Sequence, residues 1–120
     1  MAWKNYNRQN KYNSHPTEVD GIKFDSIRES QRYKELKLLE AAGEISHLEL
    51  QPKVILQDKF KHKGKMIRAI TYKADFAYFD ERNKKSVIED VKGMETDVFK
   101  IKKKMFLKKY GDSYELKITR

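Results

Sequence analysis

Apolar and polar residues alternate in the second half of the chain in a way that predicts a β-hairpin. Over Ile70–Phe79, the residues expected to share one face of a strand are Ile70, Tyr72, Ala74, Phe76 and Tyr78. Lys73 and Asp75 are expected on the other face. The turn Asp80–Lys85 has no apolar residue, and Ser86–Lys92 follows as a second strand that would pair antiparallel with the first.

Two stretches carry apolar residues at helical spacing. The first helix is expected to open over Phe24–Leu36 and to continue to about Ala42, because Gly43 is a usual residue just past a helix C-terminus. The second is expected from about Thr96 to Tyr110, and its apolar stripe is formed by Val98, Ile101, Met105 and Phe106.

Shorter apolar runs fill the rest of the chain. Glu18–Phe24 alternates around Asp20-Gly21, which is a hairpin signature. The other expected strands are Ile45–Leu50, Val54–Leu56, Met66–Ile70 and Tyr114–Ile118. The sequence therefore predicts an α/β fold, with a central mixed sheet of about four or five strands flanked by helices.

The 120 residues are expected to form one domain with a modest core. Residues 1–16 are polar, with Lys4, Arg8 and Lys11 among aromatic and asparagine residues, and are predicted to be a flexible basic arm before a domain of residues 17–120. One interpretation is an arm that contacts DNA or exchanges between subunits; the other is an ordinary frayed terminus.

Two carboxylates and an amine are expected to converge at the predicted hairpin. Asp90 and Lys92 are two residues apart, so they project from one face, where Asp75 of the paired strand can meet them. Carboxylate oxygens suit a hard cation such as Mg²⁺, which is often shared with a substrate phosphate. The alternative is a surface hairpin with a cross-strand Asp–Lys pair, because 18 acids and 27 bases make such coincidences common.

A third carboxylate, Glu29, lies in the first predicted helix. It shares a helix face with Tyr33 and Leu36, so it points towards a partly apolar surface where a carboxylate requires a cation. Ser26 and Glu29 also match a capping box, and acids are favoured in the first turn of a helix by the helix dipole. The two roles are compatible.

The order of these residues resembles the PD-(D/E)XK nuclease superfamily, which has a restriction-endonuclease-like fold. More closely, four segments look like a family of small phage proteins of formally unknown function that is similar to phage Holliday-junction resolvases: Thr17–Ser26, Leu50–Pro52, Tyr72–Phe76 and Glu89–Gly93. Ala74 stands where the superfamily name has proline. Glu89 competes with Asp90 for the second ligand position, and the register with Lys92 favours Asp90.

This resemblance implies a metal-dependent DNA endonuclease that hydrolyses phosphodiester bonds, with branched DNA such as a four-way junction as its substrate. It implies Mg²⁺, which Mn²⁺ can replace, held by Glu29, Asp75, Asp90 and the Val91 carbonyl. Lys92 would orient or help to deprotonate the attacking water and would stabilise the transition state. Two nicks resolve a junction symmetrically, so a homodimer is implied.

The charge agrees with a nucleic-acid partner. The formal charge is +9 and the pI is about 9.6. The cations expected to contact DNA are Lys73, Lys100, Lys104 and Lys108, although a lysine-rich helix face is also typical of a solvated surface. The basic turn Lys61–Lys65 has the same two interpretations, a contact with a phosphate backbone or solubility alone.

Several other function classes lack their residues in this sequence. There is no cysteine for a disulfide or a thiolate zinc site, the three histidines have no metal-ligand spacing, and no phosphate-binding glycine loop indicates a nucleotide cofactor. No long apolar span or signal pattern appears, so a cytoplasmic protein away from membranes is expected. The rival functions are a DNA-binding accessory protein without catalysis, and a nuclease with sequence-specific or end-processing preference.

Overall fold

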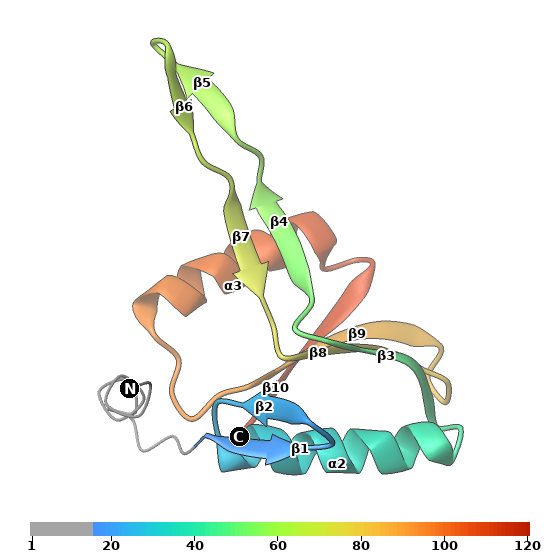
Figure 1. Ribbon diagram of the computed structural model, residues 1–120. Coiled ribbons are helices and arrows are strands. Elements are labelled where there is room, and N and C mark those ends of the chain that lie inside the picture. Colours follow the sequence, from blue (N-terminus) through green and yellow to red (C-terminus); the bar gives the residue numbers. More distant parts are fainter. Residues whose placement is uncertain (1–15) are drawn as a thin grey trace.

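A four-stranded mixed sheet lies at the centre of the computed structural model, which describes residues 16–120 (Figure 1). In their order across the sheet, its strands are β10 (Tyr114–Thr119), β9 (Lys85–Val91), β8 (Phe76–Asp80) and β3 (Ile45–Leu50). β9 pairs antiparallel with β8 and parallel with β10, and β8 pairs antiparallel with β3. The predicted α/β class and the mixed central sheet are confirmed.

The other strands form three two-stranded units. β1 (Thr17–Val19) and β2 (Ile22–Phe24) make the predicted small hairpin. Its turn residues Asp20 and Gly21 have φ values of 55° and 76°, which is the left-handed conformation that a tight two-residue hairpin requires. The remaining pairs are β4 (Lys53–Gln57) with β7 (Ile70–Lys73) and β5 (Phe60–His62) with β6 (Lys65–Ile67). Together with two helices, the described residues contain ten strands.

The first helix, α2 (Ile27–Ala41), covers one face of the sheet. It begins at Ser26, whose side chain accepts a hydrogen bond of 3.1 Å from the Glu29 amide, and it ends before Gly43, whose φ is 78°. The core under this helix contains Phe24, Tyr33, Leu36, Ile45, Phe76, Tyr78 and Val87. The predicted helix bounds are therefore confirmed to within a few residues.

The second helix, α3 (Asp97–Tyr110), and the β4–β7 ribbon form the other packed layer. Their core contains Leu56, Tyr72, Ala74, Ile88, Phe99 and Phe106. On β9, Val87 belongs to the α2 side and Ile88 to the α3 side, as expected for successive residues of a strand that is covered on both faces. The sheet thus lies between two layers, and the next residues of β9, Glu89 and Asp90, also point to opposite layers.

The single strand predicted over 70–79 is wrong. The chain breaks at Ala74-Asp75 into β7, which pairs with β4, and β8, which enters the central sheet. Tyr72 therefore packs in the α3 core, whereas Phe76 packs in the α2 core, although alternation placed both on one face. The apolar pattern is the same in both arrangements, because each half of the segment alternates by itself.

The apolar stripe predicted for α3 is also partly wrong. Val98 and Ile101 are 62% and 59% exposed, whereas Phe99 and Phe106 are buried. The rings of Phe99 and Phe106 lie 5.9 and 6.0 Å from the ring of Tyr72, centroid to centroid. The helix is therefore rotated from the predicted position, because its two phenylalanines bury more area than the branched aliphatic residues.

We expect Phe106→Ala to lower the free energy of unfolding by about 3 to 5 kcal/mol, because its ring is fully buried and its removal leaves a cavity. Ile101→Ala on the same helix is the matched control, and we expect a change of less than about 0.5 kcal/mol for this exposed position. Urea denaturation followed by circular dichroism measures both. Equal losses would mean that the helix packs through its other face.

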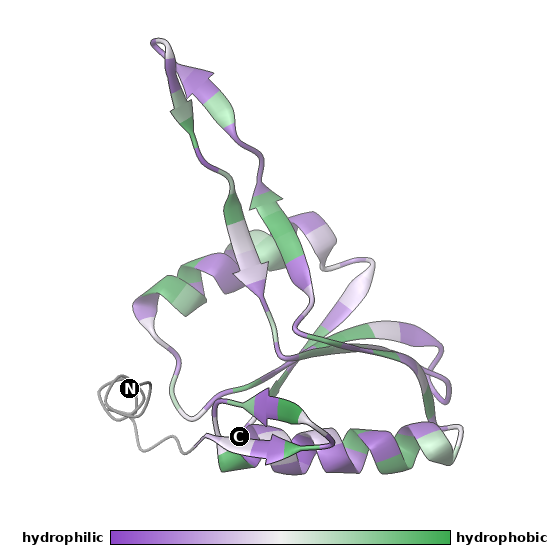
Figure 2. Ribbon diagram, in the orientation of Figure 1, coloured by the Kyte–Doolittle hydropathy of each residue, from purple (hydrophilic) through white to green (hydrophobic). Residues whose placement is uncertain are grey.

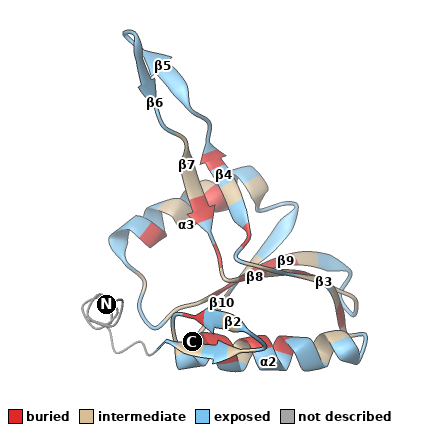
Figure 3. Cartoon of the chain, in the orientation of Figure 1, coloured by how far each residue is buried: buried red, intermediate tan, exposed pale blue. Residues whose placement is uncertain are grey.

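The β5–β6 hairpin extends away from these layers at the end of the β4–β7 ribbon (Figure 1). All its strand residues are exposed, and Figure 3 shows the whole hairpin as exposed. In Figure 2 the hydrophobic section of β4 gives way to a mainly hydrophilic turn between β5 and β6. The basic arm predicted for residues 1–16 lies, apart from Pro16, outside the described residues. Neither of the two described helices is long and apolar enough to cross a membrane.

Candidate active site

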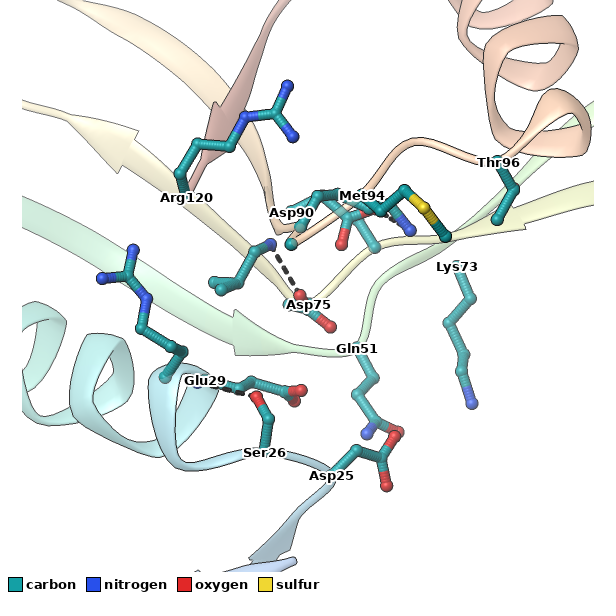
Figure 4. A pocket seen from close by; sticks show the side chains of 15 residues that line it. Asp25, Ser26, Glu29, Gln51, Lys73, Asp75, Asp90, Met94, Thr96 and Arg120 are labelled. Carbon is teal, nitrogen blue, oxygen red and sulfur yellow. Dashed lines mark hydrogen bonds and ion pairs between the residues drawn. The ribbon is translucent and has the colours of Figure 1, made fainter. Parts of the chain in front are cut away.

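An open cavity of about 770 Å³ lies beside the start of α2 and the end of β9 (Figure 4). Its lining includes all the residues that the sequence analysis assigned to catalysis or metal binding, namely Glu29, Asp75, Asp90, Val91 and Lys92. Lys73 also lines the cavity. The structure therefore brings together side chains from α2, from the β7–β8 junction and from β9.

Asp75 and Asp90 meet because of the strand register. Phe76 pairs with Glu89, so Asp75 and Asp90 lie one step beyond this pair, opposite one another. The Asp75 amide donates to the Glu89 carbonyl at 3.1 Å, which continues the ladder, and the Val91 amide donates to Asp75 Oδ2 at 2.7 Å. The Asp75 carboxyl group is held against β9 by this bond.

Asp90 is held from two sides. It is 3% exposed, and its Oδ2 accepts a hydrogen bond of 2.6 Å from the Tyr72 hydroxyl. Lys92 Nζ lies 3.5 Å from the same oxygen and 4.5 Å from the centre of the Phe99 ring. Contact with the ring face stabilises the ammonium group and limits the positions that it occupies. The predicted shared face of Asp90 and Lys92 is confirmed.

Glu29 completes the group of acids. It is 7% exposed, and while its amide donates to the side chain of the capping residue Ser26, its carboxyl group turns to the cavity (Figure 4). Burial, with the negative charges of Asp25 and Asp90, raises the pKa of Glu29 to about 7. Burial and the neighbouring Asp90 and Glu29 also raise the pKa of Asp75 well above its usual range. Three carboxyl groups thus repel one another in a partly dehydrated space.

We expect Glu29→Gln to gain stability relative to the wild type as the pH rises from 5 to 8. The raised pKa means that the folded state holds a proton which the unfolded state has released, so wild-type stability is lost as the pH rises from about 4.5 through about 7. The glutamine variant lacks this loss, which we expect to be about 1 to 2 kcal/mol because the site is partly open to water. Melting temperatures in EDTA measure the difference at each pH.

Glu40→Gln is the control for this pH dependence. A hydrogen bond from Lys37 lowers the pKa of Glu40, so its contribution is fully present throughout pH 5 to 8. The difference between this variant and the wild type should therefore stay constant over the same range. A constant difference for Glu29→Gln as well would mean that Glu29 is solvated like a surface acid.

Glu89 does not face the cavity. It is fully buried on the α2 side, where Arg32 Nε and Nη2 donate to its two oxygens at 2.6 and 3.0 Å. Tyr78 and Thr119 donate to it as well, at 2.6 and 2.8 Å. Burial by itself would raise the pKa of Glu89, but these hydrogen bonds outweigh burial and hold the pKa below its ordinary value. Asp90 is the acid of β9 that reaches the cavity, in agreement with the register argument.

We expect Arg32→Ala to lower the free energy of unfolding by about 3 kcal/mol, because it leaves the buried Glu89 carboxylate without its cation. Arg82→Ala is the control, since Arg82 pairs with Glu44 at the surface, where the loss should stay below about 1 kcal/mol. Chemical denaturation of both variants gives the comparison. A small loss for Arg32→Ala would show that Glu89 accepts water or a proton instead.

The cavity suits a hard cation such as Mg²⁺ in the chemistry of its donors. Asp75 and Asp90 present neighbouring carboxylates, and over residues 16–120 no basic side chain forms an ion pair with Asp75 or Glu29. Within the same residues, no three acidic or histidine side chains lie close enough together to hold a metal ion as they stand. Mg²⁺ is commonly held by one or two carboxylates together with waters and substrate phosphate. The Asp75–Asp90 pair therefore supplies enough protein ligands for this ion, and Glu29 lies beside the pair without being required as a ligand.

Other cations at the cavity were missed from the sequence. Arg28 and Arg120 line it, and Arg120 is paired with Glu95 at 2.9 Å. Arg28 lies in the first turn of α2, two positions after the cap, which was the available signal, whereas Arg120 arrives only through the parallel pairing of β10 with β9. The exposed lysines of α3, which are Lys100, Lys104 and Lys108, do not line the cavity.

Tyr72 and Phe99 were also missed as parts of the site. Both were counted as apolar core positions or left unassigned, and both are buried. The structure adds a polar role to Tyr72, which holds Asp90, and a positioning role to Phe99, which contacts Lys92. A tyrosine on the apolar face of a strand carries a hydroxyl that needs a partner, and this was the signal for Tyr72.

Comparison with known proteins gives a family and no further relative. No curated protein matches the chain, and no solved structure matches it. Residues 9–120 match the family described as protein of unknown function (DUF1064), which covers nearly the whole chain. The chain therefore belongs to the DUF1064 family.

Proposed function

We propose that this protein is a metal-dependent DNA endonuclease of the PD-(D/E)XK kind, with a restriction-endonuclease-like fold. The observation that carries the proposal is the meeting of Asp75, Asp90 and Lys92 in one cavity, with Glu29 beside them. Glu29, Asp75 and the Asp90–Lys92 pair come from three separate segments, so their convergence is not a consequence of closeness in the sequence. An accidental surface pair of aspartate and lysine would not explain three carboxyl groups that repel one another in a partly buried position.

Each side chain has a distinct task in phosphodiester hydrolysis. When bound, Mg²⁺ or Mn²⁺ lowers the pKa of a water molecule and neutralises charge on the scissile phosphate. Asp75 and Asp90 supply the oxygen ligands, with Glu29 and the Val91 carbonyl as further donors at the cavity wall. Tyr72 orients Asp90 through its hydroxyl group, so the ligand does not have to be ordered during catalysis.

Lys92 acts on the phosphate and the attacking water. Its ammonium group, held between Asp90 and the Phe99 ring, faces the place where negative charge develops as water attacks phosphorus. By donating a hydrogen bond it orients this water and favours the loss of a proton from the water to solvent, and the phosphorus–oxygen bond to the leaving sugar oxygen, which takes up a proton from solvent, breaks as the new bond forms. Lys73, Arg28 and Arg120 at the cavity rim bind adjacent phosphates.

Branched DNA is the substrate that we propose, cut by a homodimer. The net charge of +9 favours a polyanion, and the exposed lysines of α3 add to the basic surface. Two active sites in one symmetric assembly produce paired nicks in a four-way junction.

The test is a cleavage assay with three DNA substrates of equal length: a synthetic four-way junction, a linear duplex and a single strand. Wild type is incubated with Mg²⁺, Mn²⁺ or EDTA, beside Asp90→Asn prepared in the same way. We expect metal-dependent cleavage of the junction by wild type and none by the variant. Equal cleavage by both proteins would show a contaminating nuclease.

Two other outcomes would replace the proposal. If wild type binds the junction but cuts no substrate with either metal, the protein is a DNA-binding accessory protein. If it cuts the linear duplex at one sequence or only from an end, the protein is a nuclease as proposed, but branched DNA is not its substrate.

A further inference from the structure

The β5–β6 hairpin has no function in the site described above. It continues the β4–β7 ribbon outwards and ends in the turn at Lys63-Gly64 (Figure 1). The described residues measure 52 × 44 × 23 Å, and their radius of gyration of 16.4 Å exceeds the value of about 13 to 14 Å typical of a compact chain of this length. We call residues 58–69 the hairpin arm.

The hairpin arm is basic and has no compensating acid after its first residue. From Lys59 to Ala74 there is no aspartate or glutamate. Its basic residues are Lys59, Lys61, His62, Lys63, Lys65 and Arg68, and all are exposed. None of them forms an ion pair in the part of the chain that the structure describes. Like charges repel in such an arrangement, so its natural partner is a polyanion.

The hairpin arm also exposes apolar side chains in a defined order. Phe60 pairs with Ile67 across the ribbon, and they are 45% and 39% exposed. Lys61 pairs with Met66, which is 52% exposed, on the opposite face. Each face of the ribbon thus combines apolar atoms with cations. A purely solvating extension would not need the apolar residues, and a purely hydrophobic interface would not tolerate this density of charge.

We propose that the hairpin arm enters the major groove of a DNA duplex that flanks the bound phosphate. The major groove of B-form DNA is about 12 Å wide and admits a two-stranded β-ribbon. The face that carries Phe60 and Ile67 then contacts base edges and thymine methyl groups, while lysines of both strands reach the phosphates of the two groove walls. This inference rests on the proposed function, since it assigns a second contact to the same DNA.

The experiment uses a variant that removes three charges from the hairpin arm, Lys59→Gln, Lys61→Gln and Lys65→Gln together. Lys63 is left in place because its φ of 49° belongs to the turn. The control, Lys34→Gln with Lys37→Gln and Lys84→Gln, removes the same net charge from α2 and the β8–β9 turn, away from the hairpin arm (Figure 1). Binding to a fluorescent 30-base-pair duplex is measured in EDTA, so hydrolysis plays no part.

We expect the arm variant to bind the duplex about 10- to 100-fold more weakly than wild type near 100 mM salt. The slope of log K against log salt should fall by about 2 to 3, from three lost phosphate contacts. The control variant should keep the wild-type slope. A duplex of 30 base pairs is about 100 Å long at 3.4 Å per base pair, which exceeds the largest extent of 52 Å, so it can reach the cavity and the hairpin arm together.

Binding to double-stranded RNA of the same length distinguishes entry of the hairpin arm into the major groove from attraction between charges alone. The major groove of A-form RNA is deep and narrow, so the ribbon cannot enter it, and we expect the arm variant and the control to bind RNA with similar affinity. Equal effects of the arm charges on DNA and RNA would overturn groove entry. If the arm variant and the control variant bind DNA equally well, the hairpin arm does not contact DNA.

The oligomeric state, measured by light scattering, provides the remaining comparison. If wild type is a dimer and the arm variant a monomer, the hairpin arm joins two copies of the chain and the DNA contact is wrong. Cleavage by wild type together with equal binding of both variants refutes the inference and leaves the proposed function intact. Absence of both binding and cleavage in wild type refutes the two together.

Discussion

Asp75→Asn is expected to lower the rate of DNA cleavage about a thousandfold or more and, in EDTA at pH 8, to raise the melting temperature. The loss of rate follows from removing a charged ligand whose contribution to transition-state stabilisation is about 4 kcal/mol or more. The amide oxygen can still accept the hydrogen bond from the Val91 amide, so the local structure is preserved. Activity and stability thus change in opposite directions.

The gain in stability has an electrostatic cause. Burial and the adjacent Asp90 raise the pKa of Asp75, so the ionised carboxylate destabilises the folded protein, and stability is lost as the pH rises. The neutral asparagine removes this loss and can donate a hydrogen bond to Asp90. We expect a gain of about 1 kcal/mol or more. Mg²⁺ should stabilise wild type against heat and should stabilise the variant much less, because the variant lacks one of the two carboxylate ligands.

Asp112→Asn provides the control, since this acid is exposed near the end of α3 and does not line the cavity. It should keep wild-type cleavage and the wild-type response to Mg²⁺. The measurements are single-turnover cleavage of the junction and melting curves with and without metal. A lower melting temperature for Asp75→Asn in EDTA would mean that the carboxylate is a structural group, and the metal assignment would then lose its support.

Lys92→Gln is expected to lower the cleavage rate by about 100- to 10,000-fold while leaving metal binding in place. The range is that of a group which assists a proton transfer and stabilises charge in the transition state. Lys92 is 3.5 Å from Asp90, so its removal also relieves the competition between ammonium and metal for the same carboxylate. Mg²⁺ affinity, followed as the rise in melting temperature, should therefore be unchanged or higher.

Two comparisons make this result specific. Lys84→Gln changes a lysine paired with Glu81 at the surface and should cleave like wild type. The pH dependence of the residual rate should also change for Lys92→Gln, because the group that assists deprotonation of water is gone. If Lys92→Gln lowers only DNA affinity, with an unchanged single-turnover rate at saturating protein, Lys92 is a phosphate contact and not a catalytic group.

Local signals were sufficient where one segment acts by itself. Ser26 and Gly43 mark the two ends of α2, and Asp20-Gly21 marks a turn, because capping and positive φ depend on nearby residues only. The convergence of Asp90 and Lys92 followed from the period of two in a strand, and the hairpin register then brought Asp75 to them.

Helix rotation and strand breaks depended on distant contacts. The periodicity of α3 allowed a stripe through Val98 or one through Phe99, and Tyr72 in the β4–β7 ribbon decided between them. Alternation over 70–79 was compatible with one strand or two, and the partner strands decided the break at Ala74-Asp75. A pattern in one segment states which residues can be buried, but the neighbour that buries them is specified elsewhere in the chain.

By itself, therefore, the sequence determined the α/β class, most element bounds and the acids and lysine of the candidate site, because these follow from local spacing and charge. Only the tertiary structure decided that Glu89 is tied to Arg32 on one face while Asp90 is held by Tyr72 on the other. It also decided that Phe99 contacts Lys92 and that the basic turn lies at the end of a projecting ribbon. Those contacts join residues that are about 7 to about 57 positions apart in the sequence. Which of these contacts form depends on the burial of apolar surface over the whole chain, and no single segment determines it.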